Sequence, residues 1–353
     1  MRNGFDPNLL NELIDYAHNP PGSDPVLGNF YTTVVEMVES NRPIAQIITS
    51  VQKIRPDITY KHLAYLIFRA YQAIKLKQVD FSYRDFNSVI KWKKELQIIC
   101  SGKTRSEFKE LLATKTNSAT IYQRYIGPYA IIACLWGGRE VSIADLGCGG
   151  NYGLRGIEVK EQFEKFQDKT PKRIITKLLS KNIQLKKCIA IDKENPDSKD
   201  TITWRMACSF YPSELDQMKK IQTFEERIRL SRNVEFIRAD LLKHQPLPKK
   251  KLDAVILSTI LYQQTLPNQL ILINKAKRLL NSHGIIIIQD FALKTTPSHL
   301  DFSDSWFGKK YSYGTFITGK LTSWKFWEIL RWNNGRCRIV KPGEDFKKLQ
   351  AQL

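Results

Sequence analysis

The feature that most restricts the fold of this 353-residue chain is a series of five short apolar runs. Each is nearly continuous in apolar residues, as strands buried on both faces of a parallel sheet are. Amphipathic stretches separate them, so strand and helix patterns alternate. This alternation predicts an α/β fold with a doubly wound, mostly parallel sheet. The runs are SIADLG (142–147), CIAIDK (188–193), VEFIRADLL (234–242), LDAVILST (252–259) and GIIIIQDFA (284–292).

The part of the chain before these runs has a helical pattern. DPNLLNELIDYA (6–17) begins with an Asp-Pro capping signal and spaces its apolar residues as a helix does. The same spacing recurs in YKHLAYLIFRAYQAIKL (60–76), and prolines and asparagines punctuate the chain between such segments. We therefore expect a helical region over residues 1–120, which caps the site or selects the substrate, followed by an α/β domain over residues 121–353.

The composition is that of a globular protein with an excess of basic residues. Lys and Arg number 55 against 35 Asp and Glu, which gives a formal charge of +20. This excess attracts polyanions such as nucleic acid, an acidic protein surface or an anionic membrane, although a solvated basic surface without a partner has the same composition. The basic residues are spread along the chain in short clusters, and there is no long basic tail.

The cysteines and the longest apolar stretches restrict the class of protein. The six cysteines are far apart, without the C-x-x-C pairs of a zinc site or the dense spacing of a disulfide framework. No apolar stretch approaches the ~20 residues that cross a bilayer, and the N-terminal segment lacks the apolar core of a signal peptide. We expect a cytoplasmic protein with buried thiols, no membrane span and no bound metal. The oligomeric state stays open.

Acidic residues follow most of the apolar runs. Asp145 follows the first, Asp192 the second, Asp240 the third and Asp290 the fifth. In a doubly wound sheet, ligands bind beyond the carboxyl ends of the strands, where these residues would lie. Each acid alone fits a helix cap equally well. Acids at the ends of three successive strands, with glycines after the first, predict instead a binding pocket.

The loop after the first run, IADLGCGGNYG (143–153), indicates the kind of ligand. Its glycines allow a sharp turn and let a ligand approach the main chain without meeting a Cβ. Asp145 is placed to meet an ammonium group, and an acid such as Asp192 commonly binds the two hydroxyls of a ribose. Asp240 with Leu241 suits the amine and the ring of adenine. Both the P-loop and the G-x-G-x-x-G motif are absent, so we expect an adenine nucleoside with an amino-acid-like end.

These segments, in this order, resemble the motifs of class I S-adenosylmethionine-dependent methyltransferases over roughly residues 120–295. The resemblance implies a seven-stranded Rossmann-like sheet and S-adenosylmethionine as the cofactor. Tyr262 would face the transferred methyl group. Arg124, in TNSATIYQRYIG (116–127), would pair with the methionine carboxylate or is a surface arginine. The implied cofactor contacts are Asp145, Gly147, Cys148 and Gly149 at the methionine end, Asp192 at the ribose, and Asp240 with Leu241 at the adenine.

The chain departs from the family pattern in two places. Asn151 stands where many members have a third glycine. Gly147 and Asp192 are 45 residues apart, which is longer than usual and predicts an extra helix in TPKRIITKLLSK (170–181). The later run TITWRMACSF (201–210) is therefore a second candidate for the second strand, and Asp192 would then not lie at its end. Near the C-terminus, an Asn-Gly turn separates two candidate strands of a hairpin, although KFWEIL (325–330) fits a helix equally well.

The methyl acceptor is not determined by these motifs. The Asn/Asp-Pro-Pro-Tyr/Phe motif of amine methylation and the Pro-Cys of cytosine C5 methylation are both absent, and STILYQQ (258–264) partly resembles members that act on small molecules. We therefore favour a small molecule over the alternative, RNA. A third possibility is a binding protein that has lost catalysis. His299 is a candidate general base, oriented by Asp290 or Asp301, or else a surface histidine without a role.

Overall fold

The computed structural model describes residues 5–351, except 57, 79–80, 84–85, 119–120, 244–246, 248–250 and 294–310. It divides into two compact units, each with its own apolar core. The first contains residues 1–119 together with 198–224, and the second contains 120–197 together with 225–353. The first break lies beside the predicted boundary, but the prediction did not include the second segment of the first unit.

The first unit is helical. Asp6, Asp24 and Thr59 each accept a backbone N–H from the first turn of a helix, which satisfies a donor that the helix cannot. The ring of Phe30 lies at the centre of an aromatic core, 5.2 Å from that of Phe68 and 5.0 Å from that of Trp92. The helices are α1 (Pro7–His18), α2 (Pro25–Glu39), α3 (Pro43–Ile54), α4 (Tyr60–Lys75), α5 (Val89–Ile99), α6 (Gly102–Thr114), α10 (Lys199–Ser209) and the first part of α11 (Leu215–Ile228).

Residues 198–224 join the helical unit through the end of α10. Arg69 donates to the carbonyl oxygens of Ala207 and Phe210, at 2.9 and 2.6 Å. Gln72 donates to the same two oxygens, at 2.7 and 3.1 Å. Carbonyls at the end of a helix lack partners within the helix, and a positive charge suits that end of the helix dipole. Two side chains of α4 therefore hold the segment that interrupts the α/β unit.

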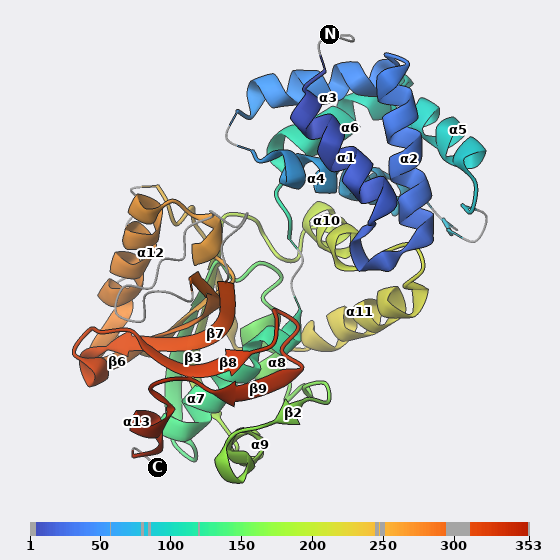
Figure 1. The fold of residues 1–353 in the computed structure, drawn as a ribbon. Helices are drawn as coiled ribbons and strands as arrows, with labels where there is room; N and C mark the ends of the chain where they lie inside the picture. Colours follow the sequence, from blue (N-terminus) through green and yellow to red (C-terminus); the bar gives the residue numbers. More distant parts are fainter. Residues whose placement is uncertain are drawn as a thin grey trace. The chain divides into compact units, whose positions relative to one another are not determined.

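The second unit is built on one sheet, in the strand order β2-β9-β8-β7-β6-β5-β1-β3-β4 (Figure 1). Strands β4-β3-β1-β5-β6 are parallel and correspond to the five apolar runs. From β1 the chain builds outward to β3 and β4, and then returns to β5 and β6 on the other side. This is the doubly wound, Rossmann-like order, with its switch between β1 and β5, and it confirms the predicted fold class. The strands are β1 (Glu140–Leu146), β2 (Gln167–Asp168), β3 (Gln184–Asp192), β4 (Val234–Arg238), β5 (Leu252–Ser258), β6 (Leu280–Leu293), β7 (Tyr311–Gly319), β8 (Trp327–Trp332) and β9 (Ile339–Pro342).

Helices pack against this sheet over a core of aliphatic side chains. Leu146, Ile191, Leu257 and Ile288 are fully buried on four of the parallel strands. Their near-continuous apolar runs are explained by burial on both faces. The helices and the 3₁₀ turns that matter below are η2 (Tyr122–Tyr125), α7 (Ile126–Trp136), α8 (Tyr152–Glu158), η3 (Pro171–Arg173), α9 (Ile174–Leu179), η4 (Leu261–Gln263), α12 (Leu266–Leu279) and α13 (Phe346–Gln350).

The sheet of the described residues has nine strands, two more than the resemblance implies. Strand β2 is only two residues long and pairs with β9, so its sequence carries no strand pattern. The insertion before β3 forms η3 and α9, as predicted. The run 201–210 forms most of α10, which leaves β3 as the strand that ends at Asp192. The segment 325–330 leads into β8 and is not helical.

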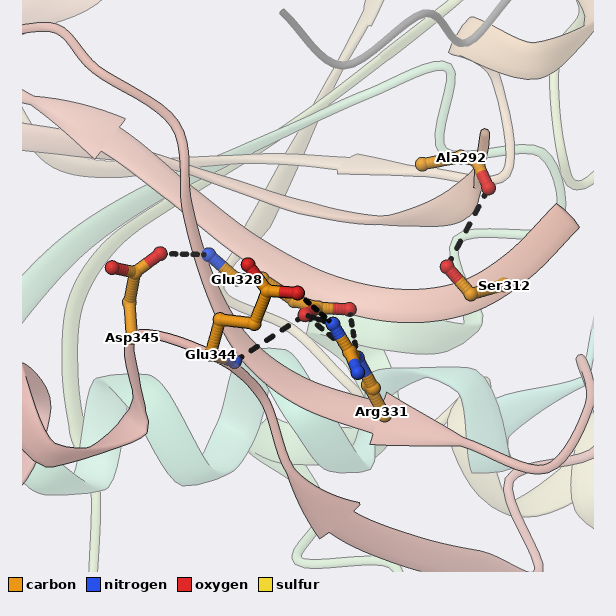
Figure 2. A network of polar contacts seen from close by, with 6 residues as sticks. All are labelled: Ala292, Ser312, Glu328, Arg331, Glu344 and Asp345. Carbon is orange, nitrogen blue, oxygen red and sulfur yellow. Dashed lines mark hydrogen bonds and ion pairs between the residues drawn. The ribbon is translucent and has the colours of Figure 1, made fainter. Parts of the chain in front are cut away.

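The antiparallel edge of the sheet is tied together by polar side chains (Figure 2). Arg331 on β8 donates from Nε to both carboxylate oxygens of Glu328, at 2.7 Å each, and from Nη2 to Glu344, at 2.6 Å. The carboxylate of Asp345 accepts the Glu328 N–H at 3.0 Å. These contacts fix the turn between β9 and α13 against β8, and the two glutamates balance the positive charge of Arg331.

Two sequence expectations concern the thiols and membrane segments. All six cysteines are buried and none forms a disulfide, as predicted. In the described part of the chain, no helix combines the length and the apolar character that a membrane span requires.

Arg69→Leu should lower the free energy of unfolding by about 2–4 kcal/mol, because the carbonyls of Ala207 and Phe210 each lose a charged donor. Urea unfolding followed by tryptophan fluorescence measures the change. Arg105→Leu is the matched control: Arg105 is exposed on α6, and its replacement should change stability by less than about 0.5 kcal/mol. Equal losses in the two variants would contradict the role of Arg69.

Candidate functional site

The candidate site begins with a buried carboxylate at the end of β1. Asp145 is 0% exposed, and its Oδ2 accepts a hydrogen bond from the Tyr125 hydroxyl at 2.8 Å. Among the described residues, its Oδ1 has no hydrogen-bond partner. Burial raises the pKa of Asp145 to about 7, while the bond from Tyr125 lowers that pKa and the charge of Asp192 raises it. Buried polar atoms are nearly always paired, so the unpaired oxygen points to a ligand.

The glycine loop turns sharply after β1, as predicted. The N–H groups of Gly147 and Cys148 both donate to the carbonyl oxygen of Ile191, at 2.8 and 3.3 Å. Gly147 has φ 71° and Gly149 has φ 53°, a left-handed conformation that glycine adopts without steric cost. The Gly149 N–H donates to Oδ2 of Asp192 at 2.8 Å. The loop is therefore fastened to the end of β3.

Asn151, at the position of the missing third glycine, has a left-handed backbone conformation. Its φ is 54° and its ψ is 31°, and asparagine tolerates this left-handed region better than most residues. Its side chain is 0% exposed, and neither Oδ1 nor Nδ2 has a hydrogen-bond partner in the described part of the chain. The loop thus contains a second buried polar group without a partner, six residues after Asp145.

Tyr125 is positioned by two glycines of α8. It is not among the site residues predicted from the sequence. A Cβ on Gly153 would lie 2.0 Å from the Tyr125 ring, and one on Gly156 would lie 2.3 Å from the Tyr122 ring. The two tyrosines and the two glycines share the same spacing of three residues, so η2 packs closely against α8. This matched spacing in the sequence could have indicated that η2 packs against α8. The close packing brings the Tyr125 hydroxyl to Asp145.

Asp192 lies where the sequence predicted, at the carboxyl end of β3. Its carboxylate accepts the N–H groups of Gly149 and Glu194, at 2.8 and 3.3 Å. Burial raises the pKa of Asp192, and the bonds from the backbone lower it. The Lys193 backbone also contributes, and since a carboxylate has about four acceptor positions, these bonds leave capacity for a ligand's hydroxyl groups.

Asp240 and Leu241 follow β4, the neighbour of β3. Oδ1 of Asp240 accepts the Leu242 N–H at 3.0 Å, which closes a local turn. Leu241 is 6% exposed and packs in the same core as Ile191. This part of the site therefore combines a carboxylate that shapes its own turn with an apolar wall.

Asp290 holds the turn that carries Tyr262. Oδ2 of Asp290 accepts the N–H groups of Leu261 and Tyr262, at 2.8 and 3.4 Å, and Oδ1 accepts that of Phe291 at 2.8 Å. Burial raises the pKa of Asp290 to about 7, whereas these bonds and the charge of Arg124 lower it. The Tyr262 ring meets the Phe291 ring edge-on at 5.1 Å. Asp290 therefore positions η4 through the backbone.

Arg124 joins three segments at the strand ends. It donates from Nε to the carbonyl oxygen of Gly335 at 3.3 Å and from Nη1 to the hydroxyl of Thr259 at 3.4 Å. Gly335 belongs to the β8–β9 turn, and Thr259 follows β5. Arg124 thus lies inside the site region, where it is half-buried, and not on an outer surface.

The structure brings most of the predicted residues to one edge of the sheet, at the carboxyl ends of β1, β3, β5 and β6. Asp145 and Asp192 influence each other electrostatically, as do Asp290 and Arg124. The predicted base His299 and its alternative partner Asp301 lie outside the described residues. Within the described residues, no group of three or more His, Cys, Asp or Glu side chains is arranged to hold a metal ion.

Comparison by sequence finds no counterpart: no family model matches the chain, and no curated protein matches it. Solved structures match about half of the chain at low identity. The order of the parallel strands is the Rossmann-like order that the resemblance predicts. This strand order confirms the predicted fold class, a doubly wound, Rossmann-like α/β sheet.

Three similar structures illustrate the likeness. A putative methyltransferase from Bacillus halodurans is 16% identical with a TM-score of 0.28, over 48% of this chain and 52% of that one. The N-methyltransferase NodS from Bradyrhizobium japonicum, in complex with S-adenosylhomocysteine, is 12% identical with a TM-score of 0.26, over 48% and 62%. Phosphoethanolamine N-methyltransferase 1 from Haemonchus contortus is 11% identical with a TM-score of 0.29, over 52% and 29%. The chain spans less than two thirds of each, and these names describe the other proteins only.

Tyr125→Phe should make the protein less stable than the wild type by an amount that grows with pH. Asp145 has a folded pKa of about 7 against its ordinary value of 3.8, so the folded state holds the proton more tightly and stability falls as pH rises between these values. Removing the bond from Tyr125 raises the folded pKa further and extends this fall to higher pH. The difference should be constant below about pH 7 and grow above it, and thermal unfolding between about pH 5 and pH 9 measures it.

Tyr129→Phe is the control for this variant. The Tyr129 hydroxyl donates to the carbonyl oxygen of Lys181, away from any buried carboxylate. Its removal should therefore cost the same stability at every pH in this range. A difference between Tyr125→Phe and the wild type that is constant with pH would show that Tyr125 does not act on the titration of Asp145.

Proposed function

We propose that this protein is an S-adenosylmethionine-dependent methyltransferase. The observation that carries the proposal is the pair of buried polar groups without partners in the glycine loop, Oδ1 of Asp145 and the carboxamide of Asn151. A fold without a ligand gains nothing from burying such groups unpaired. A ligand with an ammonium group and a carboxylate would satisfy both.

The other residues at the strand ends fit the rest of this cofactor. Asp192 retains acceptor positions for the ribose hydroxyls, and Asp240 with Leu241 offers an acceptor beside an apolar wall for adenine. Gly147, Cys148 and Gly149 would line the methionine end, where the two left-handed glycines turn the loop. Arg124 is the candidate partner of the methionine carboxylate.

When bound, S-adenosylmethionine supplies an electrophilic methyl group on a sulfonium. The contribution of the protein to such a displacement is mainly alignment and exclusion of water. Asp145 would fix the ammonium end, and the rings of Tyr262 and Phe291 would form an apolar wall near the methyl group. Asp290 would maintain that wall by holding η4. A base is needed only if the acceptor must lose a proton, and His299 is the candidate. We favour a small-molecule acceptor.

Asp145→Asn should weaken the binding of S-adenosylmethionine about tenfold or more, since a carboxylate that meets the ammonium group is lost. Asp192→Ala should have a loss of similar size, about 1.4 kcal/mol or more, through the ribose. Isothermal titration calorimetry measures both. Asp253→Asn is the matched control: Asp253 accepts the Ser142 N–H at 2.8 Å and an Asn281 N–H at 2.7 Å at the opposite end of β5. It should alter stability and leave the affinity unchanged.

The same titration has a characteristic pH dependence. The ammonium group binds the deprotonated carboxylate, so the affinity of the wild type should rise with pH through the pKa of about 7. Asp145→Asn should remove most of that rise and should also be more stable than the wild type above about pH 7, because it no longer buries a charge. If the wild type bound no S-adenosylmethionine, the proposed function would be wrong and a non-catalytic role would be favoured.

A further inference from the structure

The outer edge of the sheet in the α/β unit carries a dense group of basic side chains. Residues 165–183, the insertion before β3, contain six Lys and Arg against one Asp. Strand β2 of this insertion lies beside β9 at the end of the sheet, and α9 follows it (Figure 1). We define the basic edge as the exposed side chains Lys165, Lys169, Lys172, Arg173, Lys177 and Lys341.

The one acid of this insertion shapes the loop and does not neutralise it. Asp168 accepts hydrogen bonds from the N–H and the hydroxyl of Thr170, at 2.9 and 2.5 Å, and from those of Thr176, at 2.8 and 3.0 Å. All of its partners are neutral. The loop that it holds contains Lys172 and Arg173, whose φ angles of 51° and 50° are both left-handed. Asp168 thus stabilises a loop whose exposed charged side chains, Lys172 and Arg173, are both basic.

The basic edge has no acidic partners among the described residues. Continuing the register of β2 and β9, in which the Lys169 N–H donates to the Val340 carbonyl at 2.9 Å, places Lys169 beside Lys341. On the other side of β9, Lys341 is in register with Arg331, which is already paired with two glutamates. Like charges on neighbouring strands repel each other unless an anion lies between them. In the part of the chain that the structure describes, none of the six side chains forms an ion pair.

The side chains of the basic edge suit a nucleic acid better than the surface of a lipid bilayer. Proteins that lie on membranes insert exposed apolar side chains beside their basic ones. The large apolar side chains that are exposed in the described residues all lie outside 160–187 and 336–348. The α/β unit also holds most of the excess charge, with 35 Lys and Arg against 20 Asp and Glu. The basic edge is charged and has no large exposed apolar side chain among the described residues, and such a surface suits the phosphate backbone of a nucleic acid.

The basic edge is continuous with the candidate site. Gln123, beside Arg124 in η2, donates to the carbonyl oxygens of Glu164 and Cys337, at 3.2 and 3.3 Å. Glu164 immediately precedes Lys165, and Cys337 immediately precedes the segment that enters β9. The basic edge therefore begins at the carboxyl edge of the sheet, beside the candidate site, and follows β9 and β2 away from it.

We propose that the basic edge binds the phosphate backbone of a nucleic acid. The proposal concerns an interaction surface and holds whether or not the site binds S-adenosylmethionine. If both proposals hold, the continuity of the two surfaces makes a nucleic acid the alternative substrate class to test beside a small molecule.

The test is the triple variant Lys169→Glu, Lys172→Glu and Arg173→Glu in the full-length chain. Binding to a fluorescently labelled single-stranded RNA, and to DNA of the same sequence, is measured by anisotropy at several salt concentrations. We expect the wild type to bind RNA with strong salt dependence and the variant to bind about tenfold more weakly or worse. The slope of log K against log salt should fall by about 2–3, as expected for three lost phosphate contacts.

The matched control is Lys94→Glu, Lys103→Glu and Arg105→Glu in the helical unit. These three residues are also two lysines and one arginine at exposed positions, so the total charge changes by the same amount. The control should bind RNA nearly as well as the wild type. Equal weakening by both triple variants would show that binding follows net charge and would overturn the proposal. Circular dichroism of both variants checks that each is folded.

Two further outcomes would also overturn the proposal. The first is that the wild type binds neither RNA nor DNA at moderate salt. The second is that vesicles of phosphatidylcholine with phosphatidylserine bind more tightly than RNA and are released by the same triple variant, which would make the edge a membrane surface. Calorimetry with S-adenosylmethionine on the triple variant keeps the two proposals apart, because the cofactor affinity should be unchanged whatever the RNA result.

Discussion

The candidate site depends on one unfavourable element, the buried carboxylate of Asp145. Removing a carboxylate from water is costly unless hydrogen bonds replace the solvent, and here a single bond from Tyr125 does so for one of its two oxygens. The same loop contains the buried carboxamide of Asn151. Natural folds retain such unsatisfied groups mainly at functional sites, where a ligand completes them. Burying the unpaired oxygen of Asp145 lowers the stability of the fold, and this cost indicates that a ligand binds at the end of β1.

The surrounding residues fix the positions of Asp145 and the loops beside it. Gly153 and Gly156 let η2 approach α8 so closely that the Tyr125 hydroxyl reaches Asp145. Asp192 fastens the glycine loop to β3, and Asp290 fastens η4 to β6. Each of these carboxylates bonds backbone N–H groups, so each fixes a loop as well as a charge. Of the acids predicted from the strand ends, Asp145 alone retains an oxygen that is buried and without a partner in the described residues.

The sequence predicted what depends on local patterns and missed what depends on packing. The five apolar runs and the acids after them identified the parallel strands and their carboxyl ends, because burial on both faces leaves a continuous apolar signal. Tyr125 gave no such signal, since its role arises only when η2 packs on α8. Residues 198–224 belong to the helical unit because Arg69 and Gln72 hold the end of α10, and those residues are more than 120 positions away. The two-residue strand β2 is defined by its partner β9 and not by its own composition.

The arrangement of charge separates two kinds of ligand. The acids of the α/β unit that matter most, Asp145, Asp192 and Asp290, lie inward at the strand ends, whereas the lysines of the insertion lie exposed along the outer edge of the sheet. In sequence, these acids follow apolar runs and these lysines cluster in the insertion, and folding places the two groups on different surfaces. A ligand with a cationic end is attracted to the strand ends, and a polyanion is attracted to the edge and excluded from the buried carboxylates. One strongly basic protein can therefore keep a cationic ligand and a polyanionic one at neighbouring but distinct surfaces.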